Sequence, residues 1–373
     1  MRFRKWIYSS LLVLLLLGVA GCQSIGYYKQ AISGQMQMLS NQQPLSKLIA
    51  DSKTKPALKE KFRLVLALRE FAEKELNLVA GGRYLSYVDL QRSNAVWNIY
   101  AAPELSLKPK SWWYPVVGSV TYRGYFSEAA AEEYAAKIRK KGFDVHVGGV
   151  DAYSTLGWFK DPVLNTFIDD SERRLAALIF HELTHQRLFI SGDTEFNEAL
   201  ATAVAEEGLR RWLVTNNDIL GLEKYQVELK RKKQFVSLVR STRNSLDAIY
   251  KNRSLRDSEK RRNKELALQE MQKNYSKLKE QWGGHSGYDT WFSENVNNAK
   301  LNTVSAYYDL VPVFHQLIEE QNGDFKKFFA EMKSYGKLAK EKRHQKLAAV
   351  KVTESPVLFA APDFPRPTAN PRL

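Results

Sequence analysis

A five-residue motif, His-Glu-Leu-Thr-His at 181–185, constrains this chain more than any other feature. In an α-helix, residues four positions apart lie on one face, so His181 and His185 are expected one turn apart on a single face. No Gly or Pro interrupts the surrounding sequence, and its apolar residues recur with helical spacing. These are Leu175, Ala176, Leu178, Ile179, Leu183 and Leu188. The motif therefore predicts a buried helix that carries two potential metal ligands.

A second helix is expected directly after the first. Ser171 is a suitable N-cap for the motif helix, and Gly192 with Asp193 forms a turn signal. The helical pattern then resumes at Glu195 and continues to about Gly208. We interpret the stretch as a helical hairpin.

The hairpin predicts a third ligand on its second helix. His185 precedes Gly192 by seven residues and Glu198 follows it by six, so two antiparallel helices would hold both at a similar depth. Glu198 is the expected ligand. The alternatives on the same helix are Glu195, Glu206 and Glu207.

Two histidines and one glutamate form a common ligand set of hydrolytic zinc sites, in which the fourth position holds water. Glu182 is expected to act as the base that takes a proton from that water, and not as a ligand. The alternative is that His181 and His185 are ordinary core residues satisfied by hydrogen bonds. The complete motif favours the metal site.

Residues 1–21 have the features of a secretory signal. Three basic residues (Arg2, Arg4 and Lys5) precede an apolar run from Leu11 to Leu17. That run is shorter than the roughly 20 residues that a membrane span needs. The mature chain is therefore expected to begin at residue 22.

The signal ends in Val19-Ala20-Gly21-Cys22, which resembles the lipobox of bacterial lipoproteins, where the cysteine is lipidated. The alternative is an ordinary signal peptide with a chance cysteine, but Cys22 is the only cysteine in the chain. The residue after Cys22 is Gln23 and not an Asp. By resemblance to the common sorting pattern of lipoproteins, this indicates the outer membrane, facing the periplasm. We expect membrane attachment through lipid at Cys22.

Composition and charge define the remaining organisation. With 44% hydrophobic and 12% aromatic residues, the chain can bury a sizeable core. We expect one metallopeptidase domain over 22–349, a long charged helical arm at about 224–281 inserted in it, and a Pro-rich tail at 350–373. The arm is expected to consist of two long helices with a break near Asn252 to Ser254.

The formal net charge is +15, and the chain has no nucleic-acid motif and no Gly-rich phosphate loop. We therefore expect no nucleic-acid partner. An anionic envelope surface is a possible partner for the basic arm, although charged faces on long helices are usually only solvated.

The region before the motif predicts a small sheet. Residues 84–100, 116–126 and 143–147 have strand-like patterns, and a helix capped by Ser127 separates the last two. The expected fold class is α+β, mainly helical. Residues 151–162 are unusually aromatic. Their position suits a wall that pairs with the substrate backbone, with simple aromatic packing as the alternative.

A helix expected at 297–317 carries Tyr307 and Tyr308. Zinc peptidases commonly need a Tyr or His that stabilises the oxyanion formed when water adds to the carbonyl. Tyr307 and Tyr308 are the candidates for this catalytic role. Core aromatic residues would have the same pattern.

Several runs together resemble one known family, the predicted bacterial zinc aminopeptidases, which are lipoproteins with an HExxH motif. The runs are YRGYF at 122–126, AYSTLGWF at 152–159, HELTHQ at 181–186 and GDTEFNEALA at 192–201, together with the lipobox at Cys22. The resemblance implies a gluzincin-like site in which His181, His185 and Glu198 bind zinc and Glu182 is catalytic.

The expected function is therefore zinc-dependent hydrolysis of peptides, most simply by an aminopeptidase. An aminopeptidase needs an acidic group for the free substrate amine, and the sequence assigns none. Two alternatives stay open: an endopeptidase of the cell envelope, and a non-enzymatic zinc lipoprotein that binds the cell wall or a partner.

Overall fold

The computed structural model of the chain describes residues 22–114, 118–152 and 160–353, without the side chains of 22–25, 28–29 and 306–307. This part is mainly helical with small sheets, as the α+β prediction expected. The helices before the motif are α2 (Cys22–Ser40), α3 (Leu45–Ala50), α4 (Pro56–Glu75), α5 (Glu128–Arg139) and α6 (Asn165–Ile168). The later helices are α7 (Glu172–Arg187), α8 (Thr194–Thr215), α9 (Ile219–Lys251), α10 (Asp257–Gln281), α11 (Asp289–Ser293), α12 (Asn298–Tyr308), α13 (Val311–Glu320), α14 (Phe325–Gly336) and α15 (Lys340–Ala348). Among the described residues, no helix combines the length and apolarity needed to cross a membrane.

The strands form three sheets within the described residues. They are β1 (Gln43–Pro44), β2 (Ser86–Val88), β3 (Val96–Pro103), β4 (Trp112–Tyr114), β5 (Gly118–Val120), β6 (Arg123–Tyr125), β7 (Phe143–Val150) and β8 (Val163–Leu164). The sheet that matters for function has the order β6-β3-β7 and is antiparallel throughout. Helix α5 contacts all three of its strands, and α12 contacts β3 and β7.

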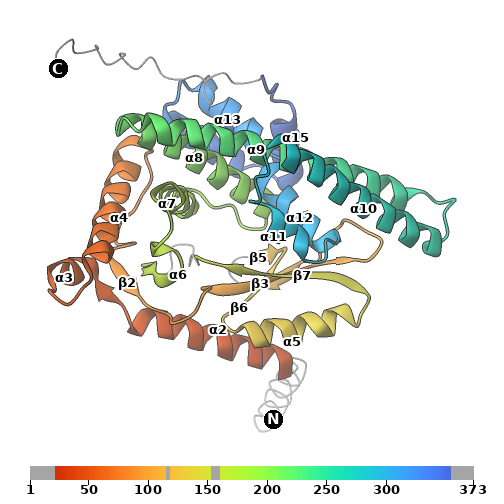
Figure 1. Cartoon of the computed structure of the whole chain (residues 1–373), viewed down its shortest axis with the longest axis horizontal. Coiled ribbons are helices and arrows are strands. Elements are labelled where there is room, and N and C mark those ends of the chain that lie inside the picture. The colour runs from red at the N-terminus through yellow and green to blue at the C-terminus, as the bar shows by residue number, and fades with distance from the viewer. Residues whose placement is uncertain (1–21, 115–117, 153–159, 354–373) are drawn as a thin grey trace, which may run out of the picture.

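The two faces of β3 differ in chemistry because successive side chains point to opposite sides of a strand. Trp97, Ile99 and Ala101 belong to a hydrophobic cluster with residues of α5. Val96 and Asn98 line a cavity together with residues of α7. In Figure 1 the sheet lies between α5 and the helices α7 and α12. One face of β3 therefore builds core, and the other faces the motif helix.

Helices α7 and α8 pack against each other in the main core. As predicted, the Ser171 hydroxyl accepts a hydrogen bond from the Arg174 amide at the start of α7. Gly192 has a φ of +80°, a backbone conformation that glycine adopts without steric cost, in the connection to α8. Helix α8 continues to Thr215, beyond the predicted end near Gly208. Buried Leu209, Trp212 and Leu213 anchor this extra part.

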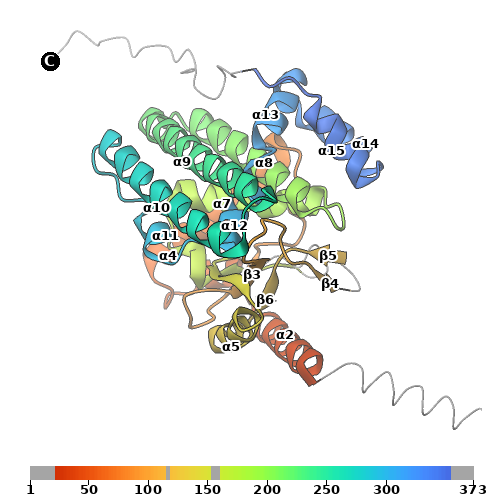
Figure 2. The same cartoon turned by 90° about the vertical axis from the view of Figure 1, so that its right-hand side faces the viewer.

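The charged arm is formed by α9 and α10, which lie side by side in Figure 2 and are separated between Lys251 and Asp257, as the sequence predicted. Its base is part of the main core. Leu222, Tyr225 and Leu229 of α9 are buried in the cluster that also holds α7 and α8.

The C-terminal region differs from the prediction in two ways. The helix expected at 297–317 is interrupted, because Pro312 lies in the first turn of a new helix, α13. The amphipathic pattern from Asp324 to Leu338 predicts the last helix of the chain, but α15 follows it, and the buried residues of α15 are Arg343 and Leu347. Most of the predicted Pro-rich tail, residues 354–373, lies outside the described residues, as do the predicted signal at 1–21 and the side chain of Cys22.

Candidate metal centre

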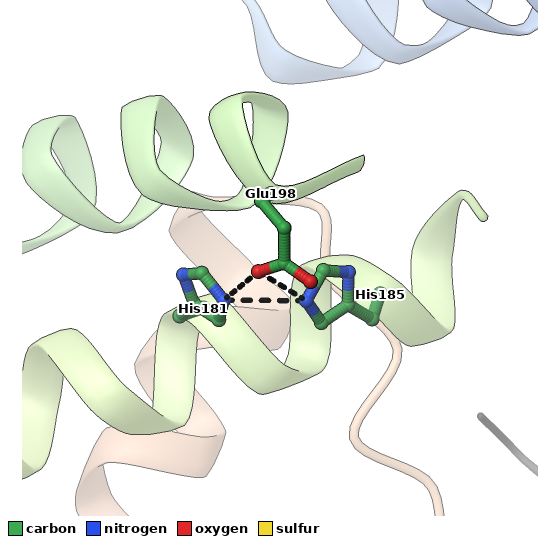
Figure 3. A group of neighbouring side chains, drawn as sticks. All are labelled: His181, His185 and Glu198. Atoms are coloured by element: carbon green, nitrogen blue, oxygen red, sulfur yellow. Dashed lines mark hydrogen bonds and ion pairs between the residues drawn. The ribbon is translucent and has the colours of Figure 1, made fainter. Parts of the chain in front are cut away.

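The side chains of His181, His185 and Glu198 meet at one point between α7 and α8 (Figure 3). The two Nε2 atoms are 3.2 Å apart. One Glu198 oxygen, Oε2, lies 3.3 Å from His181 Nε2 and 3.7 Å from His185 Nε2. All three residues are therefore arranged with potential ligand atoms facing a common centre.

This geometry fits a small divalent cation. Tetrahedral zinc with ligand bonds of about 2.0–2.1 Å holds neighbouring ligand atoms about 3.3 Å apart. The three observed separations, 3.2, 3.3 and 3.7 Å, lie close to that value. Two imidazole nitrogens and a carboxylate oxygen are also the donor types that zinc prefers. These residues can hold the ion without rearrangement of the helices.

The electrostatics of the cluster agree with a cation site. Burial would raise the pKa of Glu198, but the imidazoles of His185 and His181 outweigh it and hold that pKa far below its usual range. Burial would lower the pKa of His185, but the Glu198 carboxylate raises it. The cluster therefore stabilises positive charge. His185 Nδ1 is buried without a hydrogen-bond partner among the described residues, so the usual outer support of a metal-binding histidine is missing there.

Glu182 lies on the motif helix beside the first of these histidines and faces the cavities described below. Burial raises its pKa above that of a free glutamate, and the nearby histidines only partly oppose this effect. A carboxylate with a raised pKa is a stronger base. Glu182 has the properties of a proton acceptor next to the metal site.

The other acidic residues of α8 are not ligands. Glu206 accepts from Lys232 at 2.9 Å and pairs with His315 at 2.8 Å. Glu207 is held by two arginines, Arg210 and Arg211. Glu195 lies 4.0 Å from the His344 ring nitrogen. Of the four glutamates considered from the sequence, the structure brings Glu198 to the histidines.

Two cavities meet at His181 and Glu182. The first, which we call the aromatic cavity, has a volume of about 310 Å³ and also contacts His185 and Glu198. Its other walls come from α2, the sheet and the end of α7. They are Tyr27, Ala31, Val96, Asn98, Tyr114, Val120, Tyr122, Gly124, Phe126, Val150, Ala152 and Phe189. Among these described lining residues there is no Lys or Arg, and the acids are Glu182 and Glu198.

The second, the polar cavity, has a volume of about 780 Å³. Its lining includes charged and hydroxyl-bearing residues from α8, α9 and α12, the residue before α11 and the segment after β7. These include Asp151, Thr202, Glu206, Tyr225, Glu228, Lys232, Tyr288 and Tyr308. The Lys232 ammonium lies 4.4 Å from the centre of the Tyr308 ring, which fixes that ring at the cavity wall.

A protein-family model described as "Putative aminopeptidase" matches residues 26–347. The chain belongs to this family. Membership of an aminopeptidase family indicates a peptidase, an enzyme that hydrolyses peptide bonds, and it confirms the aminopeptidase resemblance seen in the motifs. No curated protein and no solved structure matches the chain.

In this aminopeptidase family member, the structure brings together the predicted ligands and places predicted Tyr308 in the polar cavity that His181 and Glu182 also line. The side chain of Tyr307 lies outside the described residues. Of the expected substrate wall at 151–162, residues 153–159 also lie outside them, whereas Asp151 and Ala152 line the polar cavity.

Three lining residues were missed in the sequence, for different reasons. Tyr27 lies far from the motif in a helix without a distinguishing pattern, and Lys232 is one basic residue among many in the arm. Asn98 did carry a signal, because asparagine is disfavoured in strands and stands here between aromatic and branched residues.

Proposed function

We propose that the chain is a zinc-dependent aminopeptidase with a gluzincin-like site. One observation carries the proposal. The donor atoms of His181, His185 and Glu198 all lie within 4.8 Å of one another, and the basic Glu182 lies beside them on the same cavity wall. A site that only bound zinc for structure would have no use for this base.

The chemistry divides among few groups. Zinc bound by the three ligands would lower the pKa of water and polarise the carbonyl of the peptide bond. Glu182 accepts the proton of the attacking water and then delivers it to the departing amine. Tyr308 donates its hydroxyl proton in a hydrogen bond to the oxyanion that forms at the carbonyl. Its ring is held for this role by the Lys232 ammonium.

The polarity of the cavities supports a direction for the substrate. The free amine of a peptide is cationic, and the acids of the polar cavity include Asp151. Glu206 and Glu228 also line it, but Glu206 is paired with Lys232 and Glu228 with Arg173. The Asp151 side chain is 41% exposed, and the nearest cation is Arg174 at 4.0 Å. We place the substrate amine near Asp151 and the leaving part of the peptide in the aromatic cavity.

The location is part of the same proposal. Lipid at Cys22 would tether the enzyme to the periplasmic face of the outer membrane, and its substrates would be peptides of that compartment. Helix α2 begins at Cys22 and contributes Tyr27 to the aromatic cavity, so the tether would lie one helix away from the site.

The test uses the purified mature chain. Bound zinc is measured, and hydrolysis of peptides with free and with acetylated amino ends is compared. We expect one zinc per chain and cleavage of the free-amine peptides only. Cleavage of acetylated peptides alone would contradict the aminopeptidase assignment. A zinc-loaded protein that cleaves neither would contradict the peptidase proposal.

A further inference from the structure

Asn98 is exceptional among the buried asparagines that the structure describes. Asn197 and Asn298 are 1% and 0% exposed, and both have their amides hydrogen-bonded. Asn197 exchanges two bonds with the backbone of Ile190. Asn298 donates to three carbonyls and accepts from the Tyr250 hydroxyl. Asn98 is 8% exposed, yet its side chain makes no hydrogen bond to any residue that the structure describes.

A polar group that lines a cavity without a protein partner keeps its hydrogen-bonding capacity for a ligand. The surrounding strands leave space for a partner. Asn98 lies directly opposite Gly124 on β6 and Gly148 on β7. Cross-strand neighbours project side chains to the same face, and glycine has none. The amide therefore stands between two gaps in the sheet surface.

Asn98 shares a cavity with the candidate metal ligands. Asn98 and Gly124 line the aromatic cavity together with His181, His185 and Glu198. A Cβ atom added at Gly124 would lie 3.1 Å from Asn98 Oδ1, so any larger residue there would crowd the amide. The site is thus a carboxamide with both a donor and an acceptor available in the same cavity as the metal ligands.

We propose that Asn98 binds the main chain of the peptide substrate on the leaving-group side of the cleaved bond. A peptide unit offers one N–H and one C=O, which match the acceptor and donor of a carboxamide. The other polar groups of this cavity are tyrosine hydroxyls and the catalytic cluster. The inference rests on the proposed peptidase function and assigns Asn98 a role in substrate binding.

Two substrates separate this role from a structural one. A tripeptide has peptide main chain beyond the cleaved bond, whereas an aminoacyl p-nitroanilide has an aromatic ring there. In Asn98→Leu and Asn98→Ala, kcat/KM for the tripeptide is expected to fall roughly tenfold, the effect of losing about one neutral hydrogen bond. The value for the p-nitroanilide is expected to stay unchanged. Gly124→Ala, which keeps Asn98 but crowds it, is expected to show the same selectivity.

Thermal unfolding provides the second measurement. Asn98→Leu is nearly isosteric and breaks no hydrogen bond of the described chain, so its Tm is expected to stay close to that of the wild type. The matched control Asn298→Leu leaves three carbonyls without their donor and is expected to lower Tm clearly.

The outcomes are distinct. Equal loss on both substrates, or a lowered Tm for Asn98→Leu, would show a structural role and overturn the inference. Unchanged activity on both would overturn it as well. If the wild type cleaves neither substrate, the proposed function fails first.

Discussion

The aromatic and polar cavities share His181 and Glu182 but treat polar groups in opposite ways. In the polar cavity, Glu206 and Lys232 bind each other, and His315 completes the pair. In the aromatic cavity, Asn98 is buried and has no partner in the described chain. The first arrangement fixes the walls of the site, and the second leaves hydrogen-bonding capacity for a ligand.

This difference shows that, within one site, some polar residues stabilise the fold and others are available to bind a ligand. Buried polar groups that pair with each other hold elements together, here α8, α9 and α13 through Glu206. A cavity-lining polar group without a protein partner does not hold elements together and can bind a ligand instead. The residues that both cavities share should affect all substrates, whereas those of one cavity should affect one step or one part of the substrate.

The largest effect on activity is expected for a substitution of Glu182, which lines both cavities. Glu182→Gln keeps the shape of the side chain but removes the base, so kcat is expected to fall by on the order of a thousandfold for every substrate. Zinc content should stay unchanged because Glu182 is not a ligand. Steady-state kinetics and metal analysis on the same sample check both statements. Full activity in a zinc-loaded Glu182→Gln protein would contradict the mechanism.

A smaller effect is expected in the polar cavity. Tyr308→Phe removes the oxyanion donor but keeps the ring beside Lys232, so kcat is expected to fall by about a hundredfold with little change in KM. Tyr335→Phe in the core of α14 serves as the control and should keep its activity. If both variants retain wild-type kcat, Tyr308 does not stabilise the oxyanion.

The paired charges of the polar cavity predict a pH-dependent stability. Burial would raise the pKa of Glu206, but Lys232 and His315 lower it to about 2. Because the folded pKa lies below the unfolded one, this contribution is present at neutral pH and is lost as the pH falls from about 4.5 to 2.

Glu206→Gln is therefore expected to lower the free energy of unfolding by about 3 kcal/mol at pH 7. The difference from the wild type should be smaller at pH 4. Urea unfolding at both pH values measures it. A difference that is constant or grows toward pH 4 would show that the ion pair does not stabilise the fold in this way.

The sequence predicted what local patterns encode. The ligands and Glu182 follow from helical spacing around Gly192, and the two helices of the arm follow from their charge pattern. The ends of helices were less accurate, because burial by distant elements extends α8 to Thr215. Helix α15 was missed because it has no apolar stripe: its buried residues are Leu347 and Arg343, and Arg343 pairs with buried Asp193.

The cavities could not be predicted for the same reason. The role of Asn98 depends on glycines at 124 and 148, which become its neighbours only when three strands pair. The polar cavity joins Glu206 to His315, and these residues are 109 positions apart. The roles of these residues depend on contacts between distant parts of the chain, and no local sequence pattern encodes such contacts.

The most direct test of the account is the position of the metal. Anomalous diffraction at the zinc edge should show one peak within about 2.1 Å of a ligand atom from each of His181, His185 and Glu198. The same measurement on Glu198→Ala should show a weaker peak or none. A wild-type crystal grown with zinc that shows no peak there, or a peak that Glu198→Ala leaves unchanged, would contradict the proposed centre.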